Sequence, residues 1–358
     1  MKILFFITGL YKSGAETQMI NLIEQLHFKE NISIKVVSLI EGYYESKLKQ
    51  LDIDYSICSN NLNYNMFKYI LFFKKEVSKF KPDIVHSFLF HSNIVSKIAL
   101  LIMKKNFRLI CSYRDTISNH PLIYQLEKIN KYKTDAFISN SKQADCEIKY
   151  LKHSQSISEV IDNGVRFEKI SQTNLEKLKK RYKNKKIILT IARFAEQKDY
   201  ITNIKTCYEL SKKREDFVFL YVGEGPKRDE ITSLAQEYSV NKYITFLGRR
   251  DDIAELMTFS DVFFLPTLHE SQSNVFIESM YYKLPIVTTN IKENRDLIKY
   301  AQFCKIKDYK KMATEINTIL NRGFDKEKLD KNYLYTKEKF SLSSMTQNYY
   351  KIYKTLLK

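Results

Sequence analysis

The 358-residue chain has no tryptophan and few glycines, prolines or cysteines, with eight, five and five of each. The cysteines form no C-x-x-C pair and are scattered over the chain, at Cys58, Cys111, Cys146, Cys207 and Cys304. An odd, dispersed set argues against a disulfide framework or a zinc site and favours a reducing compartment.

Long hydrophobic runs are also missing. The longest, such as IALLIM at 98–103, fall far short of the about 20 residues that a membrane-spanning helix requires. The N-terminal MKILFFITGL resembles a signal peptide, but it is too short and lacks an A-x-A-like cleavage site, so we expect a buried strand there. No short internal repeat appears, which argues against a solenoid.

The charge balance is strongly positive, with a formal net charge of +18 and a pI near 9.4. Such a surface permits binding to nucleic acid, to an anionic membrane or to phosphorylated ligands. The same composition, with lysine far above arginine and abundant tyrosine, asparagine and isoleucine, is typical of an AT-biased genome. No recognition helix, zinc knuckle or RNP-like motif appears, so we expect no nucleic-acid partner.

Short apolar runs alternate with amphipathic ones along the whole chain. The first half predicts strands at 2–9, 32–40, 83–88, 108–113 and 135–141, with helices at 15–26, 64–80 and 92–103 between them. The second half predicts strands at 185–193, 217–225, 243–248, 261–267 and 285–290, with helices around 200–213, 226–238 and 250–259. This alternation indicates an α/β protein with parallel, doubly wound sheets.

The length favours two domains. We place the first at 1–168 and the second at 169–340, because a polar, lysine-rich stretch at 171–186 precedes the next strand. The amphipathic segment 341–358 is expected to be a helix that packs back on the first domain. Two such sheets in tandem should face a central cleft, where open α/β sheets bind ligands.

Glu270 and Glu278 are separated by eight positions and flank a predicted helix start. Glu270 follows the strand at 261–267, and Glu278 lies about one turn into the helix that begins near Ser273 or Asn274. The free N–H groups of that helix end suit a phosphate. The pattern therefore predicts a site for a nucleotide diphosphate and its cargo.

An ordered set of motifs resembles the retaining nucleotide-sugar glycosyltransferases of family 4, which have the GT-B fold. The likeness covers nearly the whole chain and rests on SGAET at 13–17, IDNGV at 161–165, IARFAEQKD at 191–199, YVGEGPKR at 221–228, FLGRRDDI at 246–253 and the glutamate pair. It implies transfer of a hexose or N-acetylhexosamine, most simply from a UDP-sugar, in bacterial surface-glycan biosynthesis such as that of lipopolysaccharide or capsule.

The resemblance assigns Arg193 and Lys198 to the donor pyrophosphate, whose charge grows as the sugar bond breaks. Without the resemblance, both could be solvated cations in a chain that has many. It assigns Glu278 to the ribose hydroxyls and places Glu270 at the donor sugar. Whether Glu270 is a nucleophile or an electrostatic stabiliser stays open, and we favour front-face transfer.

The remaining donor contacts are carried over in the same way. Ser271, Gln272 and Ser273 stand where the family commonly has a Gly-containing EGFP or EGFS sequence, which leaves the donor sugar open. Backbone amides of Ser273, Asn274 and Val275 should face the phosphate. Gly14 permits close approach to a phosphate, or is a plain turn residue. Gly248 and Arg249 are expected near the nucleobase, although Arg249 and Arg250 could equally be solvated.

The first domain should bind the acceptor, and His86, Arg114 and Asp115 are the candidate contacts to acceptor or sugar. Arg114 stands where family members often carry a histidine, so a histidine base is not supported there. A strand histidine such as His86 is more often structural. The histidines form no metal pattern, and the resemblance implies a transfer with no metal and no other cofactor.

We therefore expect a nucleotide-sugar donor, a lipid-linked oligosaccharide or polysaccharide acceptor, and a cytoplasmic protein that is peripheral at the inner membrane. Outward lysines of the helix at 64–80 would help such docking, while an ordinary crossover helix is the other interpretation of that segment. A nucleotide-sugar epimerase or hydrolase, a basic nucleic-acid-binding protein and a catalytically silent scaffold are the alternative functions.

Overall fold

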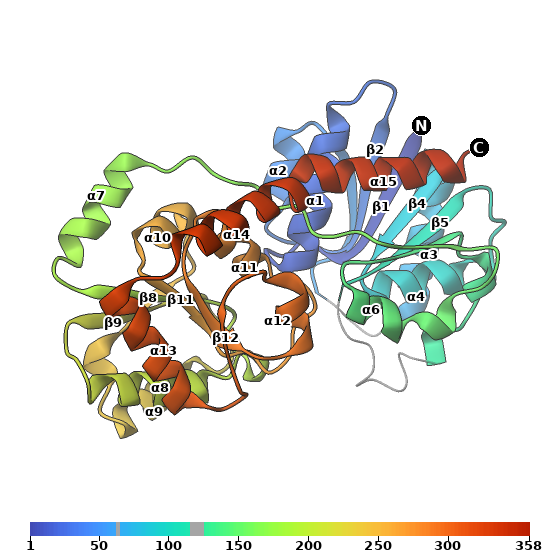
Figure 1. Cartoon of the computed structure of the whole chain (residues 1–358). Coiled ribbons are helices and arrows are strands. Elements are labelled where there is room, and N and C mark those ends of the chain that lie inside the picture. Colours follow the sequence, from blue (N-terminus) through green and yellow to red (C-terminus); the bar gives the residue numbers. More distant parts are fainter. Residues whose placement is uncertain (62–64, 115–124) are drawn as a thin grey trace. The chain divides into compact units, whose positions relative to one another are not determined.

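The computed structural model describes residues 1–61, 65–114 and 125–358. The chain forms two compact units (Figure 1). Unit 1 comprises Met1–Gly164 and Ser341–Lys358, and unit 2 comprises Val165–Phe340. The first crossing between units thus follows Gly164, four residues before the expected boundary, and the C-terminal segment belongs to unit 1.

Unit 1 contains a seven-stranded sheet in the order β3-β2-β1-β4-β5-β6-β7, and all neighbouring strands are parallel. The strands are β1 (Lys2–Gly9), β2 (Ser33–Ile40), β3 (Asp54–Ser59), β4 (Ile84–Phe88), β5 (Arg108–Tyr113), β6 (Ala136–Ser139) and β7 (Ile157–Val160). The helices are α1 (Gly14–His27), α2 (Glu45–Gln50), α3 (Met66–Phe80), α4 (Phe90–Ala99), α6 (Lys142–Glu147) and α15 (Leu342–Leu356), with 3₁₀ turns at Lys131–Lys133 and Lys149–Leu151.

The alternation along β1 shows why unit 1 has two cores. Ile3, Phe5 and Ile7 pack into one cluster with residues of α1 and α15. Leu4 and Phe6, which point to the other face, pack with residues of α3 and α4. Both faces of the sheet are therefore buried, as the continuous apolar run of β1 predicts.

Unit 2 contains a six-stranded sheet in the order β10-β9-β8-β11-β12-β13, again parallel throughout. The strands are β8 (Lys186–Ile191), β9 (Phe217–Val222), β10 (Ile244–Gly248), β11 (Val262–Leu265), β12 (Ile286–Thr289) and β13 (Gln302–Cys304). The helices are α7 (Gln172–Arg181), α8 (Tyr200–Ser211), α9 (Arg228–Glu237), α10 (Ile253–Phe259), α11 (Asn274–Tyr281), α12 (Lys292–Leu297), α13 (Tyr309–Arg322) and α14 (Lys326–Lys339), with 3₁₀ turns at Glu196–Lys198 and Asn241–Tyr243.

In each sheet the strand order reverses once, between β1 and β4 in unit 1 and between β8 and β11 in unit 2. Loops leave the carboxyl ends of the two central strands in opposite directions at such a point, and open α/β sheets bind ligands there. The segments that carry the predicted site residues follow these strands.

Several features differ from the sequence-based expectation. The edge strands β3, β7 and β13 were not predicted, because most of their side chains are exposed or only partly buried and none has a strong apolar run. Helix α4 ends at Ala99, and the apolar residues after it form a turn. The lysine-rich stretch contains helix α7, which buries Leu175 and Leu178. None of the described helices is long and apolar enough to cross a membrane.

Candidate functional site

Two loops meet at the switch point of unit 2. The loop after β8 continues into the 3₁₀ turn Glu196–Lys198, and the loop after β11 runs to α11. The backbone oxygen of Gln197 accepts hydrogen bonds from the Leu268 amide at 2.8 Å and from the Thr267 hydroxyl at 3.0 Å. These bonds fix the two loops to each other, so the side chains that they carry have a defined relative position.

Lys198 and Glu270 form an ion pair at this junction, through Nζ and Oε1. Their side chains are only 13% and 9% exposed, so the pair is largely shielded from solvent. The two residues are 72 positions apart in the sequence. The fold therefore brings together a cation and a carboxylate that the motifs identified separately, and an anionic ligand would have to share the ammonium group with Glu270.

Arg193 lies on the same loop as Lys198 and is exposed. Its neighbour Phe194 is buried and is held by backbone hydrogen bonds to Glu224 and Lys227. A Cβ atom on Gly225 would lie 2.4 Å from the Phe194 carbonyl oxygen, and only glycine permits this approach. The glycine-rich turn after β9 thus supports the loop, which presents the Arg193 guanidinium to solvent.

Helix α11 starts four residues after Glu270, with Ser273 as its N-cap. Ser273 is buried and makes no side-chain capping hydrogen bond, and the first turn holds no acidic residue. No carboxylate of the first turn therefore compensates the positive end of the α11 dipole or its free amide groups. Ser271, Gln272, Asn274 and Val275 surround this helix start, as the sequence places them.

Glu278 is half-buried on α11. Desolvation raises the pKa of its carboxyl from 4.5 to about 8, and the negative charge of Glu168 adds to the rise. Burial without a neighbouring cation makes ionisation of a carboxyl unfavourable. Groups with pKa values perturbed in this way cluster at functional sites.

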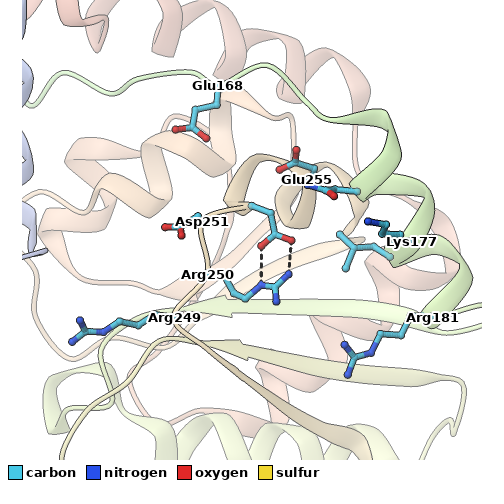
Figure 2. A pocket seen from close by; sticks show the side chains of 10 residues that line it. Glu168, Lys177, Arg181, Arg249, Arg250, Asp251 and Glu255 are labelled. Carbon is cyan, nitrogen blue, oxygen red and sulfur yellow. Dashed lines mark hydrogen bonds and ion pairs between the residues drawn. The ribbon is translucent and has the colours of Figure 1, made fainter. Parts of the chain in front are cut away.

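A pocket of about 630 Å³ lies in unit 2 between α7, the loop after β10 and α10 (Figure 2). Lys177 and Arg181 project from α7, while Arg249 lies on the loop that follows Gly248 (Figure 2). Arg250 donates two hydrogen bonds, of 2.8 and 2.6 Å, to the carboxylate of Asp252. Arg250 is thus engaged within its own loop, whereas Arg249 is exposed at the pocket wall.

In unit 1, His86 lies on β4 beside the switch point and has no exposed surface. Its Nδ1 is 2.7 Å from the Tyr353 hydroxyl, and its Nε2 is 2.8 Å from the Ser112 hydroxyl. Burial, together with the charge of Arg114, lowers the pKa of His86 well below its usual value. The imidazole is thus a neutral core group that ties β4 to β5 and α15, and its position gives no support to a contact with sugar.

Arg114 follows β5 and is half-buried. Its guanidinium donates to Asn163 Oδ1 at 2.5 Å and to the Tyr349 hydroxyl at 2.7 Å. The buried Nε has no hydrogen-bond partner among the described residues. Asp115, the third residue expected in this domain, lies outside the described residues.

Gly14 is the first residue of α1, and nothing lies within 4 Å of a Cβ atom placed on it. Internal packing therefore does not require glycine there. Two residues on, Glu16 is buried, and desolvation raises the pKa of its carboxyl despite the Ser13 hydrogen bond and the charge of Arg114. Glu16 was not among the site residues predicted from the sequence, although the Ser13–Glu16 spacing is that of a capping box.

Comparisons with known proteins agree with this architecture. Residues 12–169 match the family model "Glycosyltransferase Family 4", and residues 171–339 match "Glycosyl transferases group 1". Both doubly wound units are therefore matched, and the fold is GT-B. The chain belongs to the family 4 glycosyltransferases of the GT-B fold.

Two curated relatives illustrate the range. The "Uncharacterized glycosyltransferase MJ1059" of Methanocaldococcus jannaschii is 21% identical over 61% of this chain and 58% of that protein. A Campylobacter jejuni protein is 24% identical over 98% of both chains, and its name is "GalNAc-alpha-(1->4)-GalNAc-alpha-(1->3)-diNAcBac-PP-undecaprenol alpha-1,4-N-acetyl-D-galactosaminyltransferase". The chain spans only about half the length of several relatives, at 58%, 46% and 47%.

Among solved structures, the chain is similar to Anabaena Alr3699/HepE in complex with UDP and glucose. The TM-score is 0.85, with 18% identity, over 99% of this chain and 100% of that one. At this level of identity the likeness concerns the fold.

Proposed function

We propose that the protein transfers a hexose or N-acetylhexosamine from a nucleotide diphosphate sugar, most simply a UDP-sugar, to a lipid-linked oligosaccharide or a polysaccharide. The observation that carries this proposal is the joining of Lys198 and Glu270 at the switch point of unit 2. A helix start with no acidic residue in its first turn, and then Glu278, follow within eight residues of Glu270. This is a layout suited to an anionic donor at the place where such sheets bind nucleotides.

Four groups of residues would bind the four parts of the donor, which are the pyrophosphate, the ribose, the base and the sugar. Arg193 and Lys198 would hold the pyrophosphate, and the amides of Ser273, Asn274 and Val275 would face the same phosphates. Glu278 would accept the ribose hydroxyls, with Gly248 and Arg249 near the base. Glu270, with Ser271 and Gln272, would face the sugar.

The Lys198–Glu270 ion pair gives the transfer step a simple electrostatic form. When the bond between the anomeric carbon and the phosphate oxygen breaks, negative charge grows on the leaving diphosphate, and Lys198 and Arg193 stabilise it. Glu270 stabilises the positive charge on the sugar ring. The acceptor oxygen bonds to the same face of the carbon and gives its proton to a leaving phosphate oxygen, which yields retention without a metal.

Unit 1 would bind the acceptor at its own switch point. The hydroxyls of Thr8 and Ser87 are buried on β1 and β4 with no hydrogen-bond partner among the described residues. Arg114 and Glu16, whose charges interact with each other, belong to the same unit. Buried polar groups without partners are costly, and an acceptor's hydroxyl or phosphate groups would satisfy them.

Relatives named for undecaprenol-linked substrates support a lipid-linked acceptor. An Escherichia coli relative, 24% identical over 79% of this chain, is named "UDP-Gal:alpha-D-GlcNAc-diphosphoundecaprenol alpha-1,3-galactosyltransferase". We propose that this chain works in the same kind of setting, as a peripheral protein at the cytoplasmic face of a bacterial inner membrane, in surface-glycan biosynthesis.

A thermal-shift screen tests the donor half of the proposal. UDP, UDP-glucose, UDP-galactose and their N-acetyl forms should raise the melting temperature, because a ligand that binds only the folded chain at 100 times its Kd adds about 2.7 kcal/mol. Arg193→Ala should reduce the shift, and Lys212→Ala, which removes an exposed lysine paired with Glu209, should not. Absence of any shift with nucleotides or nucleotide sugars would refute the proposal.

Release of UDP with and without acceptor separates transfer from its alternatives. A transferase releases UDP quickly only when an acceptor glycan is present. Release at the same rate without acceptor would indicate a hydrolase, and interconversion of the sugar without UDP release would indicate an epimerase. EDTA should leave the rate unchanged if the transfer needs no metal.

A further inference from the structure

Two neighbouring segments of unit 1 expose large apolar side chains. Helix α3 presents Phe67 and Leu71, which are 67% and 44% exposed. The turn that follows α4 presents Leu101 and Ile102, which are 64% and 48% exposed. We call these four residues, together with Lys68, Lys75 and Lys104, the α3–α4 patch.

The two segments lie side by side. Helices α3 and α4 pack against each other (Figure 1), and the Lys74 ammonium donates to the Ile102 carbonyl at 3.2 Å. At helical spacing, Phe67 and Leu71 lie one turn apart and Lys74 follows on the same face.

The opposite face of α3 is well packed. Tyr69, Ile70, Phe73 and Val77 are buried in the core on that side of the sheet. The exposed apolar residues are therefore not the buried face of a poorly docked helix. They are additional to the face that a crossover helix needs, and large exposed apolar groups gathered together mark interaction surfaces.

The charge around the patch is predominantly positive. Residues 65–82 contain five lysines and a single acidic residue, Glu76, while residues 99–109 contain two lysines, one arginine and no acidic residue. Glu76 is buried, 3.1 Å from the Lys35 ammonium, and accepts from the Ser56 hydroxyl. Lys68, Lys75 and Lys104 are exposed. Asp135 pairs with Lys105 and Arg108, and the exposed Asp83 lines the same pocket as these two residues. The patch is therefore apolar at its centre, and the charge beside it is predominantly positive.

We propose that the α3–α4 patch docks unit 1 on an anionic lipid bilayer. The four apolar side chains would enter the boundary between headgroups and acyl chains, and the lysines would contact lipid phosphates. A second copy of the chain fits less well, because a two-fold interface would place lysines against lysines. The inference extends the proposed function, since a lipid-linked acceptor would be met at such a surface.

Vesicle co-sedimentation of the intact 358-residue chain tests the docking. The chain should pellet with phosphatidylcholine vesicles that contain about 30% phosphatidylglycerol, stay in solution with pure phosphatidylcholine, and be released by high salt. The triple variant Lys68→Ser, Lys75→Ser, Lys104→Ser should weaken partitioning about 100-fold, because each lysine near the surface contributes about 1 kcal/mol. The double variant Phe67→Ser, Leu71→Ser should weaken it about tenfold or more.

A matched control comes from unit 2. Leu334 is 61% exposed on α14 and Lys337 is exposed one turn later, so Leu334→Ser, Lys337→Ser removes the same kinds of side chain elsewhere. This variant should bind vesicles as the parent chain does. Docking by the patch is overturned if the parent ignores anionic vesicles, if the patch variants bind unchanged, or if the control loses as much. It is also overturned if sedimentation shows a dimer that the patch variants abolish.

Donor binding, measured by the UDP thermal shift on the same variants, keeps this inference separate from the proposed function. A shift that persists while vesicle binding is absent overturns the docking and leaves the transferase proposal standing. Vesicle binding without any UDP thermal shift would support the docking and overturn the transferase proposal.

Discussion

The polar groups at the two switch points differ in how they are satisfied. In unit 1, His86 is bonded at both ring nitrogens and Arg114 at both terminal guanidinium nitrogens, and two tyrosines of α15 supply one partner each. In unit 2, Arg193 is exposed, and Glu278 has a pKa raised to about 8 by desolvation.

The difference separates scaffold from ligand site. A polar group that the protein satisfies itself stabilises the fold and gains nothing when a ligand arrives. A group left with a cost in the unliganded chain recovers that cost when a ligand supplies the missing charge or hydrogen bond. In unit 2, Arg193 and Glu278 are therefore poised for a donor. In unit 1, His86 and the terminal nitrogens of Arg114 hold helix α15 in place, while the Thr8 and Ser87 hydroxyls and the Arg114 Nε remain for an acceptor. The predictions below test this contrast.

The largest effect is expected from Arg193→Ala in unit 2. The exposed guanidinium contributes little to folding, so the melting temperature should stay unchanged. Turnover should fall about 100- to 1,000-fold, as is typical when one group that stabilises transition-state charge is removed. Steady-state kinetics and a thermal melt measure the two quantities. Arg322→Ala, an exposed arginine at the end of α13, is the control, and unchanged turnover in Arg193→Ala would contradict the assignment.

The second-largest effect is expected in unit 1, where a substitution should lower stability and leave donor binding unchanged. His86→Ala removes a buried ring and leaves the Tyr353 and Ser112 hydroxyls without that partner. The free energy of unfolding should fall by about 2–3 kcal/mol. This corresponds to a decrease of roughly 5–10 °C in melting temperature. The folded fraction should keep its UDP thermal shift.

His91→Ala on α4 is the matched control. Because His91 is only half-buried, its replacement should lower the free energy of unfolding by less. Loss of turnover in His86→Ala at an unchanged melting temperature would show that the histidine takes part in chemistry instead.

The smallest effect concerns the pH dependence of Glu278. Its folded pKa, about 8, lies above the 4.5 of an ordinary glutamate, so the folded chain binds the extra proton between these values. Stability should therefore fall as pH rises through this window, and Glu278→Gln should remove that loss. If the ionised carboxylate holds the ribose, UDP affinity should rise up to tenfold per pH unit below 8 and then level off.

Isothermal titration of UDP between pH 6.5 and 8.5, compared for the parent chain and Glu278→Gln, isolates the contribution of this residue. The comparison cancels the titration of UDP itself. Parallel profiles for the two proteins would contradict the ribose assignment, while a parent chain whose stability is flat between pH 4.5 and 8 would contradict the raised pKa.

Much of the fold could be predicted from local pattern. Strands β1, β2, β4 and β5 are continuous apolar runs that only a sheet buried on both faces accommodates, and the sequence places them within a residue or two. The edge strands β3, β7 and β13 were not predicted, because most of their side chains are exposed or only partly buried. The end of α4 was also wrong, since the apolar residues 100–103 continue a helical pattern that the chain does not follow.

The site divides in the same way. Motif order singled out Arg193, Lys198, Glu270 and Glu278 as candidates, because short local sequences carry each of them. Glu16 and the tyrosine partners of Arg114 and His86 were missed. Their significance depends on contacts up to 267 residues apart in the chain, which no local spacing encodes.

The sequence alone determined the α/β class, the two doubly wound sheets and the family, because these follow from local apolar periodicity and from motifs in order. Only the tertiary structure decided which polar residues are already satisfied. Protonation and hydrogen bonding depend on burial and on charges brought close by folding, which is why one carboxylate pairs with Lys198 while another, eight residues later, has its pKa raised to about 8.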